Sequence, residues 1–311
     1  MLSRTADHVY WLGRYAERAE NLARALDVQY RLSLLPHALR SDELGWARVL
    51  DTLGVAAAYT ERHGAPESHR VTDFLAFDRG NPSSIMSCLW AARENARAVR
   101  GSISSEMWET FNSTWLEARA NAPSRYTAQN VAEFVEWVKY RAHLARGVVL
   151  GSMLRDEGYH FMQIGTFLER ADGVVRLMLS RLGDGEPDAT ARDHYPWSVL
   201  LRALSAFEIF RRVSRGSVTP LSVIGFATFR PDVPRSVLRS AELVYDNLRA
   251  VANTESAETE RRAGLLHARL RFGTPGELLA DGAGPYLRSL LAASGDIAAR
   301  IGRDFLGHGP A

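Results

Sequence analysis

Hydrophobic residues recur along most of this 311-residue chain with the period of about 3.6 residues that is typical of amphipathic helices. No stretch shows the sustained alternation of polar and apolar positions that marks a half-buried strand. The pattern predicts two series of helices, at 4–33, 42–62, 83–101, 104–119 and 127–153, and at 156–182, 196–214, 235–252, 255–269 and 276–304. Two short apolar segments, 71–77 and 218–229, fit either a helical turn or an extended piece.

The second series follows the first at a shift of 152 residues. HVYWLGRYAERAE at 8–20 matches HFMQIGTFLERAD at 160–172, and 74–100 matches 226–252 at the same shift without a gap. Internal repeats constrain the whole architecture. We therefore predict an all-α helical bundle built from two tandem repeats of about five helices, related by a pseudo-two-fold axis. The repeats would cover 1–153 and 154–311, and because no Gly-, Pro- or Ser-rich linker joins them near 150–156, we expect one intertwined body.

Two further features recur in both repeats. The segments Asn81-Pro82-Ser83-Ser84 and Val233-Pro234-Arg235-Ser236 resemble helix starts, with a proline suited to the first turn and a serine available as a cap. Gly13 and Gly165 lie inside predicted helices, where glycine costs on the order of 1 kcal/mol relative to alanine. We therefore expect a backbone or a ligand to approach closely at both glycines.

The dipeptides Glu17-Arg18 and Glu169-Arg170 occupy the same place in the two repeats. On a helical projection each arginine lies at the edge of an apolar stripe, and each glutamate lies about 100° further round. The four side chains could form buried ion pairs that cross the pseudo-two-fold axis and fix how the repeats pack. They could instead line a central cleft, with the carboxylates as acid and base and the arginines as anion clamps. The sequence leaves both readings open.

Each of these helices also carries an acidic residue four positions before an arginine. The pairs are Glu20 with Arg24 and Asp172 with Arg176. This order stabilises a helix by a few tenths of a kcal/mol. We predict i,i+4 ion pairs here, which require no functional explanation.

Histidine and asparagine give weaker signals. His8 and His160 lie in the middle of the apolar stripes, without the Glu-x-x-His spacing of a metal-binding bundle, so we predict satisfied core histidines and no metal site. Asn95 and Arg97 recur as Asn247 and Arg249, and these four could satisfy helix ends or form a binding wall. No phosphate-binding loop, dinucleotide glycine motif or nucleophile elbow occurs, so we predict no cofactor.

The composition narrows the class of protein. A hydrophobic content of 46% supports a large core, and a net charge of +2 gives no strong attraction to nucleic acid or to an anionic membrane. Lys139 is the only lysine among 38 basic residues, which indicates a coding bias or, alternatively, an arginine-rich surface for phosphate or carboxylate recognition. A third reading of the arginine content is a nucleic-acid binder. A single cysteine, Cys88, and the lack of a signal peptide or a membrane-length apolar run predict a cytoplasmic protein with no membrane association.

Three stretches together resemble the bacterial alpha-E domain family. They are LSRTADHVYWLGRYAERAENLARAL (2–26), AARENARAVRGSISSEMWETFN (91–112) and GYHFMQIGTFLERADGVVRLM (158–178). Members of that family recur beside, or fused to, circularly permuted ATP-grasp proteins, often with a transglutaminase-like protease nearby. The family's Glu-Arg pairs correspond to Glu17/Arg18 and Glu169/Arg170, and its second signature corresponds to Arg93, Glu94, Asn95 and Arg97.

The resemblance implies a role in a ligation system that joins a carboxylate to an amine. We expect an accessory helical subunit that docks an ATP-grasp ligase or binds a charged peptide or amino-acid end. The nucleotide chemistry would then lie in the partner, since this chain has no nucleotide-binding motif. The alternative is a stand-alone enzyme that uses Glu17 or Glu169 as acid or base in a central cleft.

Overall fold

The computed structural model describes residues 1–33, 42–122, 127–182, 194–214, 216–280 and 282–307, and within them it contains helices and no strand. The first half holds α1 (Ser3–Ser33), α2 (Asp42–Leu53), α3 (Ala56–His63), α4 (Ser68–Ala76), α5 (Ile85–Ala98), α6 (Ser105–Asn121) and α7 (Ala128–Ser152). The second half holds α8 (Glu157–Leu182), α9 (Tyr195–Ala203), α10 (Phe207–Val213), α11 (Pro220–Phe229), α12 (Val237–Ala250), α13 (Ala257–Phe272), α14 (Pro275–Ala280) and α15 (Ala283–Asp304). The predicted all-α class is confirmed.

Three of the predicted helices are each broken into two. The breaks lie near Gly54, Ser205 and Gly282, whose φ angles are 72°, 54° and 78°. A residue with a left-handed backbone cannot continue a right-handed helix, so the chain changes direction at each of these points. The hydrophobic period continues across the breaks, and this is why it predicted uninterrupted helices. The two ambiguous segments are both helical, as α4 and α11.

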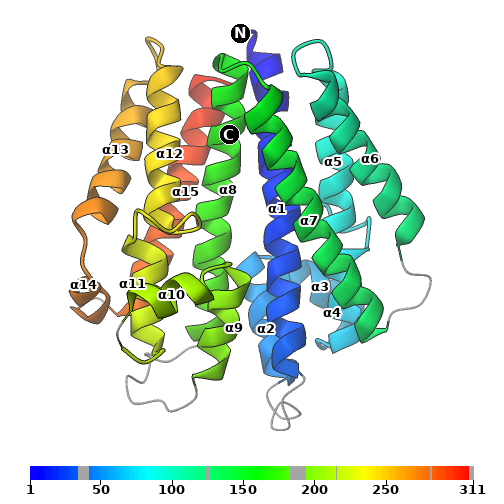
Figure 1. Cartoon of the computed structure of the whole chain (residues 1–311), viewed down its shortest axis with the longest axis vertical. Coiled ribbons are helices and arrows are strands. Elements are labelled where there is room, and N and C mark those ends of the chain that lie inside the picture. The colour runs from blue at the N-terminus through cyan, green and yellow to red at the C-terminus, as the bar shows by residue number, and fades with distance from the viewer. Residues whose placement is uncertain (34–41, 123–126, 183–193, 215, 281, 308–311) are drawn as a thin grey trace.

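The helices α1 and α8 lie side by side at the centre of the molecule (Figure 1). The helices α5, α6 and α7 lie on the α1 side, and α12, α13 and α15 lie on the α8 side. The chain passes from the end of α7 at Ser152 to the start of α8 at Glu157 without a long linker, as predicted. The two helices that carry the Glu-Arg dipeptides therefore meet, and their contact positions the site described below.

Gly13 and Gly165 lie where the backbones of α1 and α8 come closest. A Cβ atom at Gly13 would lie 2.5 Å from the carbonyl oxygen of Met162, and one at Gly165 would overlap the carbonyl oxygen of Tyr10. Any side chain at either position would push the two central helices apart. The expectation of a close approach at both glycines is confirmed.

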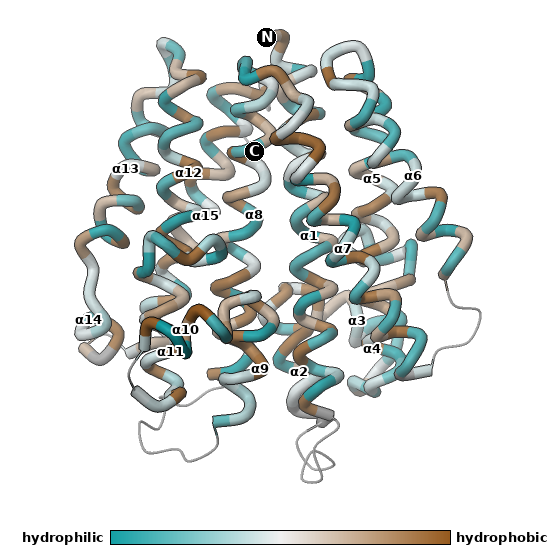
Figure 2. Tube along the Cα trace, viewed as in Figure 1, coloured by the Kyte–Doolittle hydropathy of each residue, from teal (hydrophilic) through white to brown (hydrophobic). Residues whose placement is uncertain are grey.

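The cores contain residues from both halves of the chain. Ala25 and Val28 of α1 belong to the core formed mainly by α8 to α12 and α15, while Met162 of α8 packs with Val9 and Leu12 among α5, α6 and α7. The short helices also cross over, since α2 packs against α8 and α9 packs against α1. Hydrophobic and hydrophilic residues are interspersed along the long helices (Figure 2). No helix of the described residues is long and apolar enough to span a membrane.

The helices α5 and α12 begin as predicted. The hydroxyl of Ser84 accepts a hydrogen bond from the backbone N–H of Ser87 at 3.1 Å, and the hydroxyl of Ser236 accepts one from the backbone N–H of Arg239 at 3.0 Å. Such caps satisfy donors that a helix leaves unpaired in its first turn. The residues just before these caps are Ser83 and Arg235. Ser83 borders a cavity beside the central helices, whereas Arg235 pairs with carboxylates of α1.

Candidate functional site

The two Glu-Arg dipeptides exchange partners between the central helices. Arg170 of α8 donates to both carboxylate oxygens of Glu17 on α1, Nε to Oε1 at 3.0 Å and Nη2 to Oε2 at 2.7 Å. Arg18 of α1 donates to both oxygens of Glu169 on α8, at 2.6 Å and 3.0 Å. Two parallel hydrogen bonds to one carboxylate are the strong and geometrically specific form of an arginine ion pair. The four residues thus fix how α1 and α8 are aligned.

The Glu17 cluster consists of Glu17, Glu20, Arg24, Arg146, Arg170 and Arg235. Arg235 bridges the two carboxylates, with Nη1 at 3.0 Å from Glu17 and Nη2 paired with Glu20. Arg24 donates to Glu20 from the same helix at 2.6 Å and 3.0 Å, and Arg146 of α7 also pairs with Glu20. Glu17 is 2% exposed and Glu20 is fully buried, so arginines completely enclose both carboxylates.

The charges around this cluster hold both carboxylates ionised. Burial acts to raise the pKa of Glu17, but Arg170 and Arg235 outweigh it and hold the pKa below its ordinary value. Burial opposes ionisation of Glu20 as well, yet Arg235, Arg24 and Arg146 hold its pKa well below the ordinary value. Four arginines face two carboxylates here, and the geometry leaves no carboxylate oxygen directed at solvent. The Glu17 cluster has the character of a structural ion-pair network.

The Glu169 cluster consists of Glu169, Asp172, Arg14, Arg18 and Arg176. Arg14 donates through Nε to Glu169 at 2.5 Å and through Nη1 to the hydroxyl of Tyr10 at 2.8 Å. Its Nη2 lies 3.9 Å from Oδ2 of Asp172, which is too far for a hydrogen bond. Glu169 is therefore held on two sides by arginine, whereas Asp172 is held only loosely.

The pKa of Glu169 falls to about 2, because Arg14 and Arg18 outweigh the burial that acts to raise it. The carboxylate consequently carries its charge throughout the neutral range and has little affinity for a proton. A general base works best when its pKa lies near the operating pH. Glu169 is suited to ionic binding rather than to proton transfer near neutral pH.

A cavity of about 220 Å³ adjoins the Glu169 cluster. Its polar wall contains the whole cluster, together with Asn21 and Ser83, and its apolar wall is formed by Leu22, Leu53, Val55 and Leu75. The Arg18 side chain is 24% exposed, whereas Arg170, its counterpart in the other dipeptide, is 7% exposed. Three arginines and two carboxylates leave this wall with one net positive charge. The cavity can therefore hold a small polar molecule with an anionic group.

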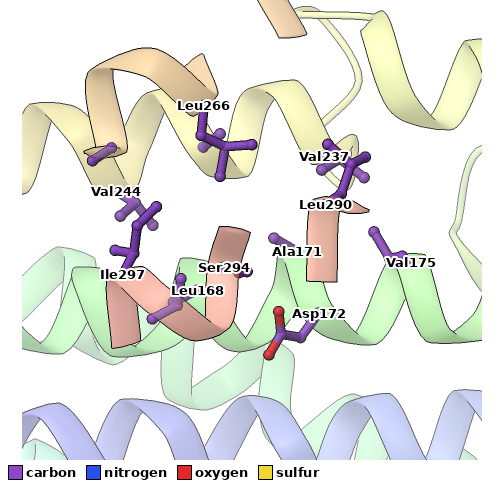
Figure 3. A pocket seen from close by; sticks show the side chains of 12 residues that line it. Leu168, Ala171, Asp172, Val175, Val237, Val244, Leu266, Leu290, Ser294 and Ile297 are labelled. Carbon is purple, nitrogen blue, oxygen red and sulfur yellow. The ribbon is translucent and has the colours of Figure 1, made fainter. Parts of the chain in front are cut away.

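Asp172 differs from the other acidic residues of the two clusters. Burial raises its pKa, and the nearby Arg14 lowers it only in part. Its Oδ1 atom is buried without a well-formed hydrogen bond among the described residues, although the nearby hydroxyl of Ser294 also acts to lower the pKa. On its other side Asp172 borders an apolar space of only about 10 Å³, which lies between α8, α12, α13 and α15. Figure 3 shows the Asp172 carboxylate at the margin of that space, on the side nearest α1. A space of that size is at the lower limit for a single water.

Glu17 adjoins a different space. A cavity of about 80 Å³ between α1, α6, α7 and α8 is lined by Glu17, Arg146, Thr166 and mostly apolar side chains. Arg146 closes the polar end of this space by pairing with Glu17 at 3.3 Å. The larger and more polar space therefore lies at Glu169.

The sequence missed several members of the clusters. Arg14, Arg146 and Arg235 were not singled out, although Arg14 lies one helical turn before Arg18 and could have been found by that spacing. The predicted i,i+4 pair of Glu20 and Arg24 is present, but it is part of the buried network. The predicted pair of Asp172 and Arg176 is wrong, because Arg176 donates to the backbone carbonyl of Thr52 instead.

The second set of predicted site residues lies elsewhere. Nδ1 of His8 lies 2.8 Å from Oδ1 of Asn95, and Nδ1 of His160 lies 2.7 Å from Oδ1 of Asn247, so both histidines are hydrogen-bonded as expected. Arg97 is paired with Glu94 and its side chain is 63% exposed, and Arg249 is exposed beside the ring of Tyr245. None of Asn95, Arg97, Asn247 and Arg249 lines the cavity at Glu169.

Other reactive groups add no chemistry to the site. Burial raises the pKa of the Cys88 thiol to about 12, which leaves it unreactive at neutral pH. Within the described residues no three histidine, cysteine or acidic side chains come together as metal ligands would. The site therefore consists of arginines, carboxylates and a cavity.

Comparison with known proteins places this arrangement in a family. A family model called Alpha-E, described as a predicted alpha-helical domain with a conserved ER motif, matches residues 1–306. ER denotes the Glu-Arg dipeptide, which this chain carries on both central helices. Proteins named as uncharacterized, one from Mycobacterium bovis and two from Mycobacterium tuberculosis, are 28% identical over 93% of this chain. The chain spans 35% of the length of these relatives. No solved structure matches it.

Proposed function

The chain belongs to the Alpha-E family, and on that premise we propose that it is an accessory helical protein of a carboxylate–amine ligation system. It would act in the cytoplasm, associate with an ATP-grasp ligase and hold a charged amino-acid or peptide end for that partner. The association with an ATP-grasp ligase comes from the family resemblance. The binding of a charged end rests on the site itself.

The cavity at Glu169 is the observation that carries the proposal. Arg14, Arg18 and Arg176 surround it, and Arg18 keeps Nη1 free of any hydrogen bond to the described residues while its other nitrogens hold Glu169. An arginine held by a carboxylate behind it presents its remaining donors in a fixed direction, which suits recognition of a carboxylate. The cavity is below the roughly 300–1,000 Å³ of sites for drug-sized ligands, so it suits one end of a chain or one small molecule.

The alternative of a stand-alone enzyme has less support. Glu17 is enclosed by arginines, and the pKa of Glu169 is about 2, so neither carboxylate is poised to exchange protons near neutral pH. The third reading, a nucleic-acid binder, also has less support, since the net charge is only +2.

We also propose that the two halves are copies of one helical unit related by a pseudo-two-fold axis. Their hydrogen bonds recur at the predicted shift: His8 pairs with Asn95, and His160 pairs with Asn247. The capped helices α5 and α12 begin at Ile85 and Val237, again 152 residues apart. Each Glu-Arg dipeptide pairs with the other, as a pseudo-two-fold axis between α1 and α8 requires.

Co-expression tests the proposed function. The chain is produced with an ATP-grasp protein encoded beside it, and complex formation, ATP hydrolysis and amide product are measured. We expect a complex, no ATP hydrolysis by the isolated chain, and a product yield that falls at least about tenfold with Arg18→Ala while assembly persists. Arg97→Ala is the matched control, because Arg97 is exposed and pairs only locally with Glu94. ATP hydrolysis by the pure chain, or failure to form the complex, would refute the accessory role.

A further inference from the structure

The two clusters differ at one position that the fold makes equivalent. Ser83 precedes the cap of α5 and Arg235 precedes the cap of α12. Arg235 extends to the carboxylates of α1 and pairs with both of them. Ser83 lines the cavity beside the Glu169 cluster, and its short side chain does not fill it. The cavity therefore lies where the other half of the molecule has a guanidinium.

Arg235 shows what chemistry this position accepts. Its guanidinium donates to Glu17 through Nη1 at 3.0 Å and pairs with Glu20 through Nη2, so it bridges two carboxylates three residues apart. At the cavity the two carboxylates three residues apart are Glu169 and Asp172. Arg14 hydrogen-bonds to Glu169 but lies 3.9 Å from Asp172, so no guanidinium of the described residues hydrogen-bonds to both. The hydroxyl of Ser294 helps to support the Asp172 carboxylate, but the buried Oδ1 atom has no well-formed hydrogen bond within the described residues. A buried carboxylate oxygen that lacks a donor is costly, and a ligand that supplies one removes that cost.

The cavity also offers donors for an anion. Arg176 donates through Nη1 to the carbonyl of Thr52, and its Nε and Nη2 have no hydrogen bond within the described part of the chain. Arg18 likewise keeps Nη1 available. With three arginines against two carboxylates, a ligand that brought only a positive charge would face a net positive wall. A ligand that brings both charges meets a complementary partner for each.

The remaining wall is apolar. Leu22, Leu53, Val55 and Leu75 line it. Burying one aliphatic side chain against such a wall contributes roughly 1.5–3 kcal/mol. The volume of about 220 Å³ accommodates a single amino acid better than an extended peptide.

We propose that the cavity binds a free α-amino acid with an aliphatic side chain. Its ammonium group would donate to Asp172 and Glu169 in the place that Arg235 occupies at the Glu17 cluster, and its carboxylate would accept from Arg18 and Arg176. The side chain would lie against the four apolar residues. This inference rests on the proposed function, because it names the class of charged end that the site holds.

Calorimetric titration of the full chain at neutral pH tests the inference with three probes. L-leucine carries both charges, 4-methylpentanoate carries only the carboxylate, and isopentylamine carries only the ammonium. We expect L-leucine to bind and each single-charge analogue to bind at least about tenfold more weakly, since each lacks one charged hydrogen bond worth about 1.5–3 kcal/mol.

Three variants locate the binding. Asp172→Asn should weaken L-leucine at least about tenfold and leave 4-methylpentanoate unchanged. Ser83→Arg should abolish binding, because it places in the cavity the side chain that fills the Glu17 cluster, and its melting temperature shows whether the chain still folds. Arg97→Ala should bind like the unmodified chain.

Two outcomes would overturn the inference. If L-leucine does not bind, the cavity is not an amino-acid site, and the association with the ligase remains to be judged by its own co-expression test. If 4-methylpentanoate binds as tightly as L-leucine, the site recognises a carboxylate alone. That second result would leave the proposed function standing, because a peptide C-terminus is also a charged end.

Discussion

The Glu17 and Glu169 clusters are built from the same dipeptide on two helices that lie side by side, and they have opposite characters. Glu17 and Glu20 are enclosed by four arginines, and the cavity that adjoins them is mostly apolar and only about 80 Å³ in volume. Glu169 is held by Arg14 and Arg18 beside a cavity of about 220 Å³. A motif therefore does not by itself decide between scaffold and site. The decision lies with side chains that reach it from other helices, here Arg235 and Arg146 at one cluster and Ser83 at the other.

The largest expected effect is a difference in unfolding free energy between variants of the two clusters. Glu17→Gln leaves buried arginines facing a neutral amide, and loss of one partner from a buried ion pair costs about 3–5 kcal/mol. Glu169→Gln should cost less, because Arg18 is 24% exposed and the cavity admits water that can solvate it. Urea unfolding at neutral pH measures both. Equal losses of unfolding free energy would remove the distinction between scaffold and site.

Acid should act strongly on the Glu169 cluster. The pKa of Glu169 in the folded chain is about 2, below its ordinary value of 4.5, so its ionisation stabilises the fold above about pH 4.5 and this stabilisation is lost as the pH falls towards 2. The shift corresponds to about 3 kcal/mol. Unfolding free energies measured from about pH 5 down to about pH 2 should fall less steeply for Glu169→Gln than for the unmodified chain.

Asp172 should respond with the opposite sign. Its pKa is raised in the folded chain, so its ionised form at neutral pH destabilises the fold, and this penalty grows as the pH rises through that pKa. Asp172→Asn should therefore preserve or increase stability at neutral pH while it weakens ligand binding. Thermal melts of Asp172→Asn at neutral pH measure this change in stability. A loss of stability as large as that of Glu17→Gln would show that Asp172 is a structural residue.

A smaller effect tests what the two clusters share. Gly13→Ala and Gly165→Ala each insert a methyl group into the contact of α1 with α8, and such overpacking costs about 1–3 kcal/mol. Gly147→Ala on α7 is the control, since a Cβ there meets nothing within 4 Å. It should stabilise the chain by up to about 1 kcal/mol through helix propensity. Similar behaviour of all three variants would mean that the central helices are not in close contact.

The smallest effect compares the helix starts that lie next to the clusters. Ser84→Ala and Ser236→Ala each remove a cap, at a cost of about 1 kcal/mol. Both serines are fully buried, so we expect the two losses of unfolding free energy to agree. A clear difference between them would show that Ser83 and Arg235 alter the start of the helix as well as the space beside it.

Much of the architecture could be predicted from the sequence because it depends on local pattern. The hydrophobic period indicated the long helices, and the serine caps indicated where α5 and α12 begin. The glycines indicated a close approach of a backbone or a ligand, and in the structure α1 and α8 approach each other there. The breaks at Gly54, Ser205 and Gly282 were not predicted, because they depend on backbone torsions that leave the hydrophobic period unchanged.

The candidate site was predictable only in part. The Glu-Arg residues were identified, but their partners lie 151 to 153 residues away along the chain, and Arg235 lies 218 residues from Glu17. Periodicity carries no information on such distances. Asp172 and Arg176 had the spacing of a helical pair, and the structure separates them because the carbonyl of Thr52, brought there by packing, accepts from Arg176 instead.

The sequence by itself determined the helical class, the repeated pattern and the identity of the charged residues, since these follow from composition and from contacts within a few residues. The tertiary structure decided which arginine meets which carboxylate and where a cavity remains. Ser83 and Arg235 look alike in the sequence as residues before a helix cap, and they differ in what they do because one side chain reaches across to the opposite central helix and the other does not. Burial makes that difference important for the free energy of the fold, because a charge enclosed away from water is costly unless it has a partner within the fold.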